Sequence, residues 1–108
     1  MGTEKYFIAL TTLPVDGDAE ALARTLVDEK LAACVNILPS MRSVYTWKGR
    51  TESANERQLL IKTTGLRLRE LESRLRELHP YEVPEFVVIP IVDGGSAYLA
   101  WLTESTVN

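Results

Sequence analysis

Side chains suited to chemistry are concentrated in one short segment, His79-Pro80-Tyr81-Glu82-Val83-Pro84-Glu85. His79 is the only histidine of the chain, and Glu82 and Glu85 follow it closely enough to add oxygen ligands. Borderline and soft metals take two to four nitrogen or sulfur ligands, so one imidazole alone does not make a site. We therefore treat His79, Glu82 and Glu85 as candidate metal ligands. The alternative is that the His79 ring bonds a carbonyl of the last turn of a helix.

A second set of residues is a candidate for a pocket: Tyr45, Trp47, Glu56, Lys62 and Tyr81. Tyr45 and Trp47 alternate in a β-branched, aromatic stretch, so both face the same side of the predicted strand. Their aromatic area suits either a contact between subunits or stacking on a ligand. Glu56 and Lys62 either form an ion pair or line a cleft that Tyr81 borders.

The remaining reactive residue is the single cysteine, Cys34, between Ala33 and Val35. A free cysteine in such a strand is most often a small buried hydrophobe. The sequence contains no paired cysteines, no G-x-S-x-G motif and no glycine-rich loop that could hold phosphate. We therefore expect a protein that is not an enzyme.

Alternating strand and helix patterns must position these residues. Asp18 is a candidate N-cap for a first amphipathic helix that runs to about Leu31. The second helix carries a leucine stripe with a Glu70–Arg74 pair four residues apart, and His79-Pro80 ends it. Strands are predicted at residues 5–12, 32–38, 43–47, 59–63 and 86–92, with a short helix after Ser96. Pro39 predicts a bulge or an edge position, and Pro90 does the same for the last strand.

The two central strands form a hairpin around a turn at Lys48-Gly49-Arg50. Its arms, which return through Glu56, are longer than the ~5–6 residues of a typical strand. A lone two-stranded ribbon is marginally stable in water, so we expect the overhang with Tyr45 and Trp47 to be buried against another copy of the chain.

The predicted order is β-α-β-β-α-β with a short C-terminal helix, which indicates an α+β, ferredoxin-like sandwich. At about 150 residues per domain, the 108 residues form one domain, residues 1–108. Right-handed crossovers place both long helices on one face of the sheet. The other face also carries apolar residues, which is typical of an assembly surface.

Composition excludes several classes of protein. The net charge of −3 leaves no basic excess for nucleic acid or an anionic membrane surface. No apolar run approaches the ~18 residues of a membrane span, and the apolar run that follows the polar segment Met1–Lys5 is too short for a signal peptide. We expect a cytoplasmic protein.

Five motifs in order resemble the CutA family of divalent-cation tolerance proteins. They are Leu31–Asn36, Tyr45-x-Trp47-x-Gly49-Arg50, Glu56 with Lys62-Thr63, the segment from His79 to Glu85, and Tyr98-Leu99-x-Trp101-Leu102. The resemblance runs from about Phe7 to Leu102. It implies a homotrimer with interlocked hairpins, a ligand pocket between subunits near His79-Pro80-Tyr81, and divalent metal tolerance.

The resemblance also implies a cofactor, a divalent metal ion such as copper. The family's cysteine in the first strand corresponds to Thr11 here, and its pair of histidines corresponds to Leu78-His79, so only His79 carries over. An alternative function is a signalling trimer resembling the PII proteins, with a small anion or metabolite bound between subunits near Lys62, Tyr81 and Glu85. A third is a structural scaffold that recruits other proteins.

Overall fold

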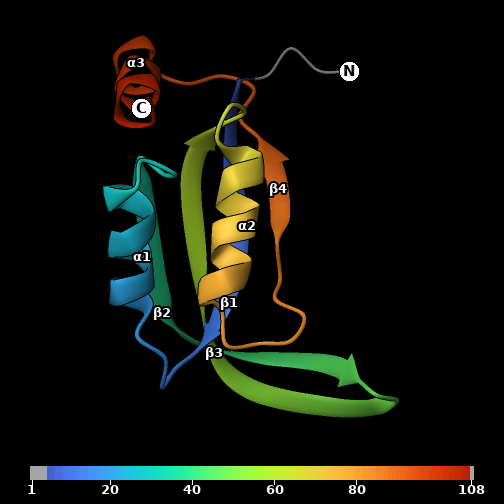
Figure 1. Ribbon diagram of the computed structural model, residues 1–108. Coiled ribbons are helices and arrows are strands. Elements are labelled where there is room, and N and C mark those ends of the chain that lie inside the picture. The colour runs from blue at the N-terminus through green and yellow to red at the C-terminus, as the bar shows by residue number, and fades with distance from the viewer. Residues whose placement is uncertain (1–4, 108) are drawn as a thin grey trace.

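The computed structural model describes residues 5–107, so the ends of the expected domain and most of the polar segment Met1–Lys5 lie outside the described residues. The elements follow the predicted order (Figure 1): β1 Tyr6–Pro14, α1 Ala19–Asp28, β2 Cys34–Trp47, β3 Arg50–Thr64, α2 Leu68–Leu78, β4 Val87–Pro90 and α3 Ser96–Ser105. The strands form one sheet in the order β2-β3-β1-β4, with every neighbouring pair antiparallel. The α+β, ferredoxin-like fold expected from the sequence is confirmed.

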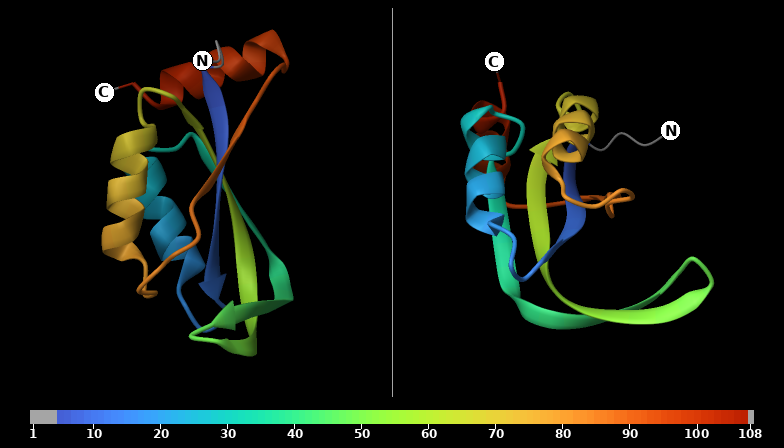
Figure 2. Two further views of the ribbon diagram at one scale, coloured as in Figure 1. Left: turned by 90° about the vertical axis from the view of Figure 1, so that its right-hand side faces the viewer. Right: turned by 60° about the horizontal axis from the view of Figure 1, so that its bottom comes forward.

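The core lies between the sheet and the two long helices, which cover the same face of the sheet (Figure 2, left). Leu26 of α1 and Leu71 of α2 are fully buried, as are Leu59 and Ile61 of β3. Leu59 and Ile61 are two residues apart, so both point to the helix side. The leucine stripe of α2 thus packs where the sequence pattern placed it.

Local sequence determines where the helices end. Asp18 is the N-cap of α1, and its carboxylate accepts the backbone N–H of Ala21 at 3.0 Å. The helix ends at Asp28, earlier than expected, because Lys30 adopts a left-handed conformation with φ of 61°. The chain after it folds back, so that the N–H of Leu31 donates to the carbonyl of Leu26 at 2.9 Å.

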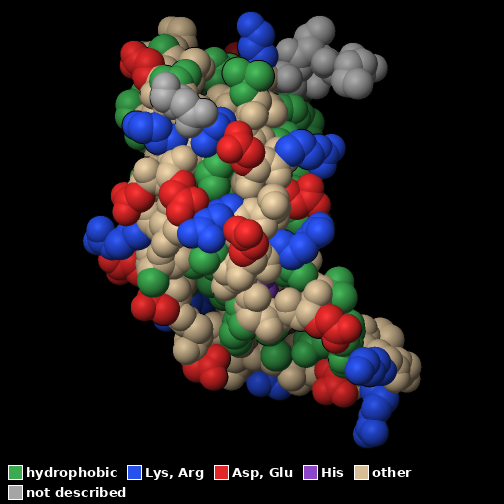
Figure 3. All heavy atoms as spheres, in the orientation of Figure 1, with side chains coloured by type: hydrophobic (Ala, Val, Ile, Leu, Met, Phe, Trp, Pro, Cys, Tyr) green, Lys and Arg blue, Asp and Glu red, His purple; other side chains and the backbone are tan. Residues whose placement is uncertain are grey.

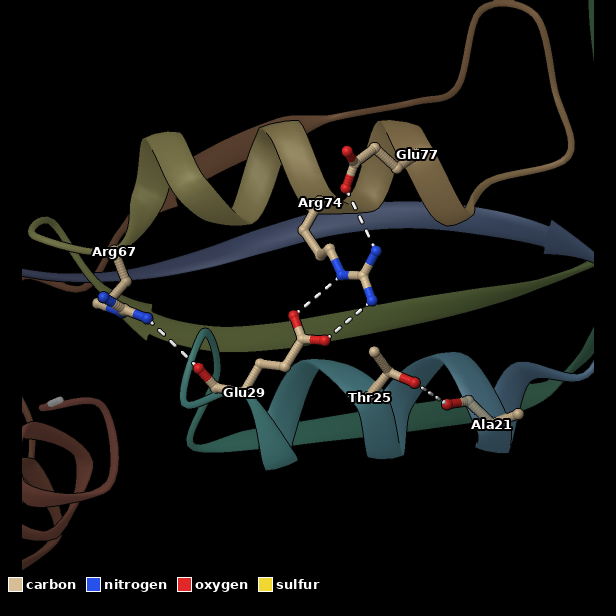
Figure 4. Close-up of polar contacts among 6 residues, drawn as sticks. All are labelled: Ala21, Thr25, Glu29, Arg67, Arg74 and Glu77. Carbon is tan, nitrogen blue, oxygen red and sulfur yellow. Dashed lines mark hydrogen bonds and ion pairs between the residues drawn. The ribbon is translucent and has the colours of Figure 1, made fainter.

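Two arginines of the α2 region tie the helices together (Figure 4). Both oxygens of Glu29 accept from Arg74 at 2.9 Å, and Glu77 accepts from the same guanidinium at 3.3 Å; these hydrogen bonds raise the pKa of Arg74. The expected Glu70–Arg74 pair does not form. The Glu70 carboxylate instead accepts at 2.8 Å from the guanidinium of Arg67, which lies one turn earlier. Acidic and basic side chains are interspersed over this outer face (Figure 3).

The hairpin is longer than any other part of the sheet. β2 has 14 residues and β3 has 15, and β1 pairs with β3 only as far as Pro14 opposite Glu56. Residues 42–47 and 50–55 therefore form a two-stranded extension, the hairpin arm, which curves away from the body (Figure 2, right). Lys48 and Gly49 both have positive φ, which is typical of the two-residue type I′ turn that suits the twist of a hairpin.

Both prolines act as expected, with one correction. The register between β2 and β3 shifts between Ile37 and Ser40, so Pro39 lies in a bulge, and Pro90 lies in the edge strand β4. However, Pro39 does not divide two separate strands, because β2 continues from Cys34 through the bulge to Trp47.

The helix α3 packs across one end of the sheet (Figure 2, left). Leu102 is fully buried, and the Tyr6 and Thr103 hydroxyls lie 2.8 Å apart. Elsewhere on the side opposite α1 and α2, the edge strand β4 leaves Val87 and Ile89 nearly half exposed. No helix within residues 5–107 is long and apolar enough to cross a membrane.

Candidate functional site

A pocket of about 730 Å³ lies between the hairpin arm and the loop that follows α2. Its walls include Tyr45, Trp47, Glu56, Tyr81 and Glu85. Its size is in the range of pockets that bind small molecules. The structure thus brings together most of the residues that the sequence pointed out, although they are spread over some forty positions.

The hairpin supplies one wall of this pocket through strand alternation. Tyr45 and Trp47 are two residues apart in β2, so they face the same side. Met41 pairs with Glu56 across the hairpin, which places Glu56 on that side as well. The predicted common orientation of the two aromatic residues is therefore what the strand geometry produces.

The loop wall begins at His79, which is buried. Its Nε2 lies 2.7 Å from the carbonyl oxygen of Thr12, and its Nδ1 accepts the backbone N–H of Tyr81 at 3.1 Å. Nε2 must therefore carry the proton, and both ring nitrogens are occupied. The expected bond to a carbonyl of the helix's last turn is replaced by this bond to β1. A metal ion could reach the ring only by breaking one of these two bonds.

Tyr81 and Glu56 join the loop to the hairpin. The Tyr81 hydroxyl donates to the Glu56 carboxylate at 2.7 Å. Partial burial raises the pKa of Tyr81, and the hydrogen bond to the negatively charged Glu56 raises that pKa further. The phenol therefore stays protonated and acts as a donor across the neutral pH range.

A second polar link lies beside the first. The amide nitrogen of Gln58 donates to the Glu85 carboxylate at 2.9 Å and to the carbonyl oxygen of Thr11 at 2.7 Å. Gln58 was missed in the sequence analysis. Gln58 lies two residues after Glu56 in β3, so both side chains point to the same side of the strand. This two-residue alternation is the sequence signal that identifies Gln58 as a pocket residue. Glu82 lies at the exposed rim.

Lys62 is not part of this pocket, and its expected ion pair with Glu56 does not form among the described residues. The two residues share a face of β3, but six residues of extended strand separate them by about 20 Å. The Lys62 ammonium instead lies 5.9 Å from the ring centroid of Tyr98 in α3. Cys34 pairs with Lys62 across the sheet and is partly buried.

Thr11 and His79, two of the positions that the family resemblance linked to copper, are buried. The Thr11 side chain is completely buried, and its hydroxyl has no hydrogen-bond partner among residues 5–107. Within the same residues, no three His, Cys, Asp or Glu side chains lie close enough together to hold a metal ion. A single copy of the described chain therefore supplies carboxylates to the pocket but no assembled set of metal ligands.

The charge of the pocket has one sign. Glu56, Glu82 and Glu85 line it, and no Lys, Arg or His is among its lining residues. A cavity with one sign of charge and low-dielectric walls attracts ligands of the opposite sign. The pocket of this copy is thus suited to a cation and unfavourable to an anion.

Comparison with known proteins agrees with this fold. Residues 7–105 match the family described as CutA1 divalent ion tolerance protein. The divalent-cation tolerance protein CutA of Thermus thermophilus is 46% identical over 99 residues, which cover 92% of this chain and 96% of that protein. The relative from Arabidopsis thaliana, named as chloroplastic, is 43% identical over 106 residues, which cover 98% of this chain and 58% of that protein.

Solved structures lead to the same family. The CutA crystal structure from Xylella fastidiosa superposes with a TM-score of 0.90 at 38% identity, covering 94% of this chain and 98% of that one. The solved structure of the Thermus thermophilus protein gives a TM-score of 0.90 at 44% identity, with the same two coverages. The chain belongs to the CutA1 family of divalent ion tolerance proteins.

Proposed function

We propose that this protein is a cytoplasmic homotrimer that acts in divalent-cation tolerance through binding rather than catalysis. The observation that carries the proposal is the hairpin arm, which extends past β1 and pairs with no third strand within residues 5–107. Val44 is 71% exposed on one side of the arm, and Tyr45 and Trp47 are more than a third exposed on the other. An isolated ribbon of this kind is marginally stable in water.

A second copy of the chain is the proposed cover. β4 is an exposed edge strand with an apolar surface at Val87 and Ile89, and such edges readily pair with another chain. Exposed aromatic and aliphatic surface of this kind is characteristic of interfaces between copies. The number three comes from the resemblance to the family. In this arrangement the pocket lies where copies meet.

The oligomeric state is tested by light scattering coupled to size-exclusion chromatography. A particle of three times 12.1 kDa, stable on dilution, is expected. A monodisperse particle of 12.1 kDa at working concentration would show that the hairpin arm is stable alone and that the proposal is wrong.

For divalent metals, we propose weak binding at the carboxylates of Glu82 and Glu85, with His79 outside the ligand set. The rim carboxylate of Glu82 is exposed, whereas both His79 nitrogens are in hydrogen bonds. One or two carboxylates without nitrogen ligands hold Cu²⁺ with a dissociation constant on the order of a millimolar, or ~4 kcal/mol.

Calorimetric titration with Cu²⁺ tests this assignment. Glu82→Gln and Glu85→Gln should each weaken binding, whereas His79→Ala should give the wild-type isotherm. Glu104→Gln, a charge change on the exposed side of α3, is the matched control. Loss of the Cu²⁺ heat in His79→Ala with the assembly intact would instead make His79 a ligand.

The pocket also supports a second function, a small-molecule sensor of the PII type. Its volume suits a metabolite. An anionic ligand, one of the two ligand classes expected for a PII-like trimer, is disfavoured because Lys62 lies outside the pocket and three carboxylates line its walls. In a thermal-shift screen, a ligand at 100 times its dissociation constant adds ~2.7 kcal/mol of stability. Cationic compounds should give such shifts, and anionic ones should not.

A further inference from the structure

Glu56 is a nearly buried carboxylate that forms no ion pair within the described part of the chain. Glu56 is only 6% exposed, and its side chain lines the pocket. Acidic side chains are rarely this buried unless they are paired. No Lys, Arg or His side chain within residues 5–107 forms an ion pair with it.

The one bond that Glu56 makes does not neutralise it. Its Oε2 accepts from the Tyr81 hydroxyl, a neutral donor, and no described group bonds its other oxygen, Oε1. By contrast, Glu85 next to it accepts from the Gln58 amide. The pocket thus contains a carboxylate whose second oxygen has no hydrogen-bond partner among residues 5–107 and can accept from a ligand.

Aromatic side chains line the pocket together with this carboxylate. Tyr45, Trp47 and Tyr81 line the same pocket, and an aromatic ring attracts a cation through the negative charge of its face. Rings together with a carboxylate are the surroundings that recognise substituted ammonium groups.

We propose that the pocket binds a small organic cation, an amine or quaternary ammonium compound, with its charged group between Glu56 and the rings of Tyr45 and Tyr81. The inference rests on the proposed function, because it assigns a ligand class to the same pocket. A bare metal ion fits the interior poorly, since aromatic rings are not metal ligands and the volume of about 730 Å³ far exceeds one ion. An inorganic or organic anion would meet three carboxylates.

The test uses three compounds of nearly identical shape and different charge. Choline is the cation, 3,3-dimethylbutan-1-ol is its neutral analogue with carbon in place of nitrogen, and 3,3-dimethylbutanoate is the anion. Titration calorimetry on the full chain should give at least tenfold tighter binding for choline than for the alcohol. The anion should give no heat of binding.

Two variants locate the site. Glu56→Gln keeps an oxygen that accepts from Tyr81 but removes the charge, so choline binding should weaken about tenfold and binding of the alcohol should not change. Glu104→Gln removes one negative charge from α3, outside the pocket, and should leave both affinities unchanged. Because the particle mass is measured on the same samples, failure of assembly is distinguished from failure of the ligand assignment.

Three results would overturn the inference. Equal affinities for choline and the alcohol would show that the pocket recognises apolar shape and not positive charge. Choline affinity unchanged in Glu56→Gln would place the site elsewhere. Absence of choline binding by a particle of trimer mass would mean that another copy of the chain fills the pocket.

Discussion

The body, which is the sheet covered by α1 and α2, and the base of the hairpin arm differ in how their buried charged side chains are bonded. Arg67 in the body is 7% exposed, and its guanidinium donates to the carbonyls of Lys30 and Glu29 and to the Glu70 carboxylate. Glu56 at the base of the arm is equally buried, but its one hydrogen-bond partner among residues 5–107 is the neutral Tyr81 phenol. The body therefore pairs this buried charge within the chain, whereas the Glu56 carboxylate at the pocket has no charged partner among residues 5–107.

The apolar residues divide in the same way. Leu26, Leu59, Ile61 and Leu71 of the body are fully buried within one copy. The arm and β4 instead leave large apolar side chains exposed, because no helix covers them. The body therefore buries its apolar surface within one chain, whereas the arm would bury its apolar surface only in the proposed trimer. Substitutions in the two regions should therefore have different consequences.

The largest effect is expected from Leu59→Ala in the body. Leu59 is fully buried between the sheet and the helices, so truncation removes apolar contacts and leaves a cavity. Such substitutions cost about 3 kcal/mol of unfolding free energy. Urea denaturation of wild type and variant measures the difference. Leu66→Ala, in the turn before α2, is the control, because its 90% exposure predicts a change within about 0.5 kcal/mol. A Leu59→Ala loss below that of Leu66→Ala would contradict this prediction.

Next in size is Trp47→Ala on the arm, which should weaken the assembly rather than the body. A large aromatic residue that anchors an interface typically contributes ~2 kcal/mol or more to association. Sedimentation velocity over a dilution series should therefore show dissociation at higher concentrations than for wild type. Trp47→Phe keeps much of the aromatic surface and should lie between the two. An unchanged dissociation constant for Trp47→Ala would mean that this ring is not at the interface.

The body could be predicted from the sequence because its signals are local and repeat at regular intervals. The Asp18 cap, the leucine stripe that ends before Pro80, and Pro90 in an edge strand each act within a few residues. The end of α1 could not be predicted as well, because the left-handed conformation of Lys30 depends on the following residues folding back onto Leu26.

The sequence points to several side chains that line the pocket, but it includes Lys62, which lies elsewhere, and omits Gln58. Glu56 and Lys62 are predicted either to form an ion pair or to line a cleft that Tyr81 borders. Strand geometry puts those two residues far apart and brings Tyr81 to Glu56 from a loop 25 positions away in sequence. Contacts of this range depend on the whole fold, and no local pattern encodes them.

A smaller effect is expected from Tyr81→Phe, which removes the link between the loop and the arm. Loss of a hydrogen bond to a charged group costs about 1.5 kcal/mol. Since folding raises the pKa of Tyr81 above its ordinary value of 10.0, the protonated phenol favours the folded state. Its contribution is complete below about pH 10 and is lost as the pH rises through the raised pKa. Wild type should therefore lose more stability than the variant between pH 10 and 11 in urea denaturation, and parallel profiles would contradict this.

The smallest effect concerns two buried threonines on the helix side of the sheet, Thr11 and Thr63, both fully buried. The Thr63 hydroxyl donates to the carbonyl of Leu31 at 2.7 Å, whereas the Thr11 hydroxyl has no partner among residues 5–107. Thr11→Val replaces a desolvated hydroxyl with a methyl group and should stabilise the fold by about 1 kcal/mol, or raise Tm by about 4–6 °C. Thr63→Val should do the reverse, because the Leu31 carbonyl loses its donor. Calorimetry on both variants would count against this account if the two shifts had the same sign.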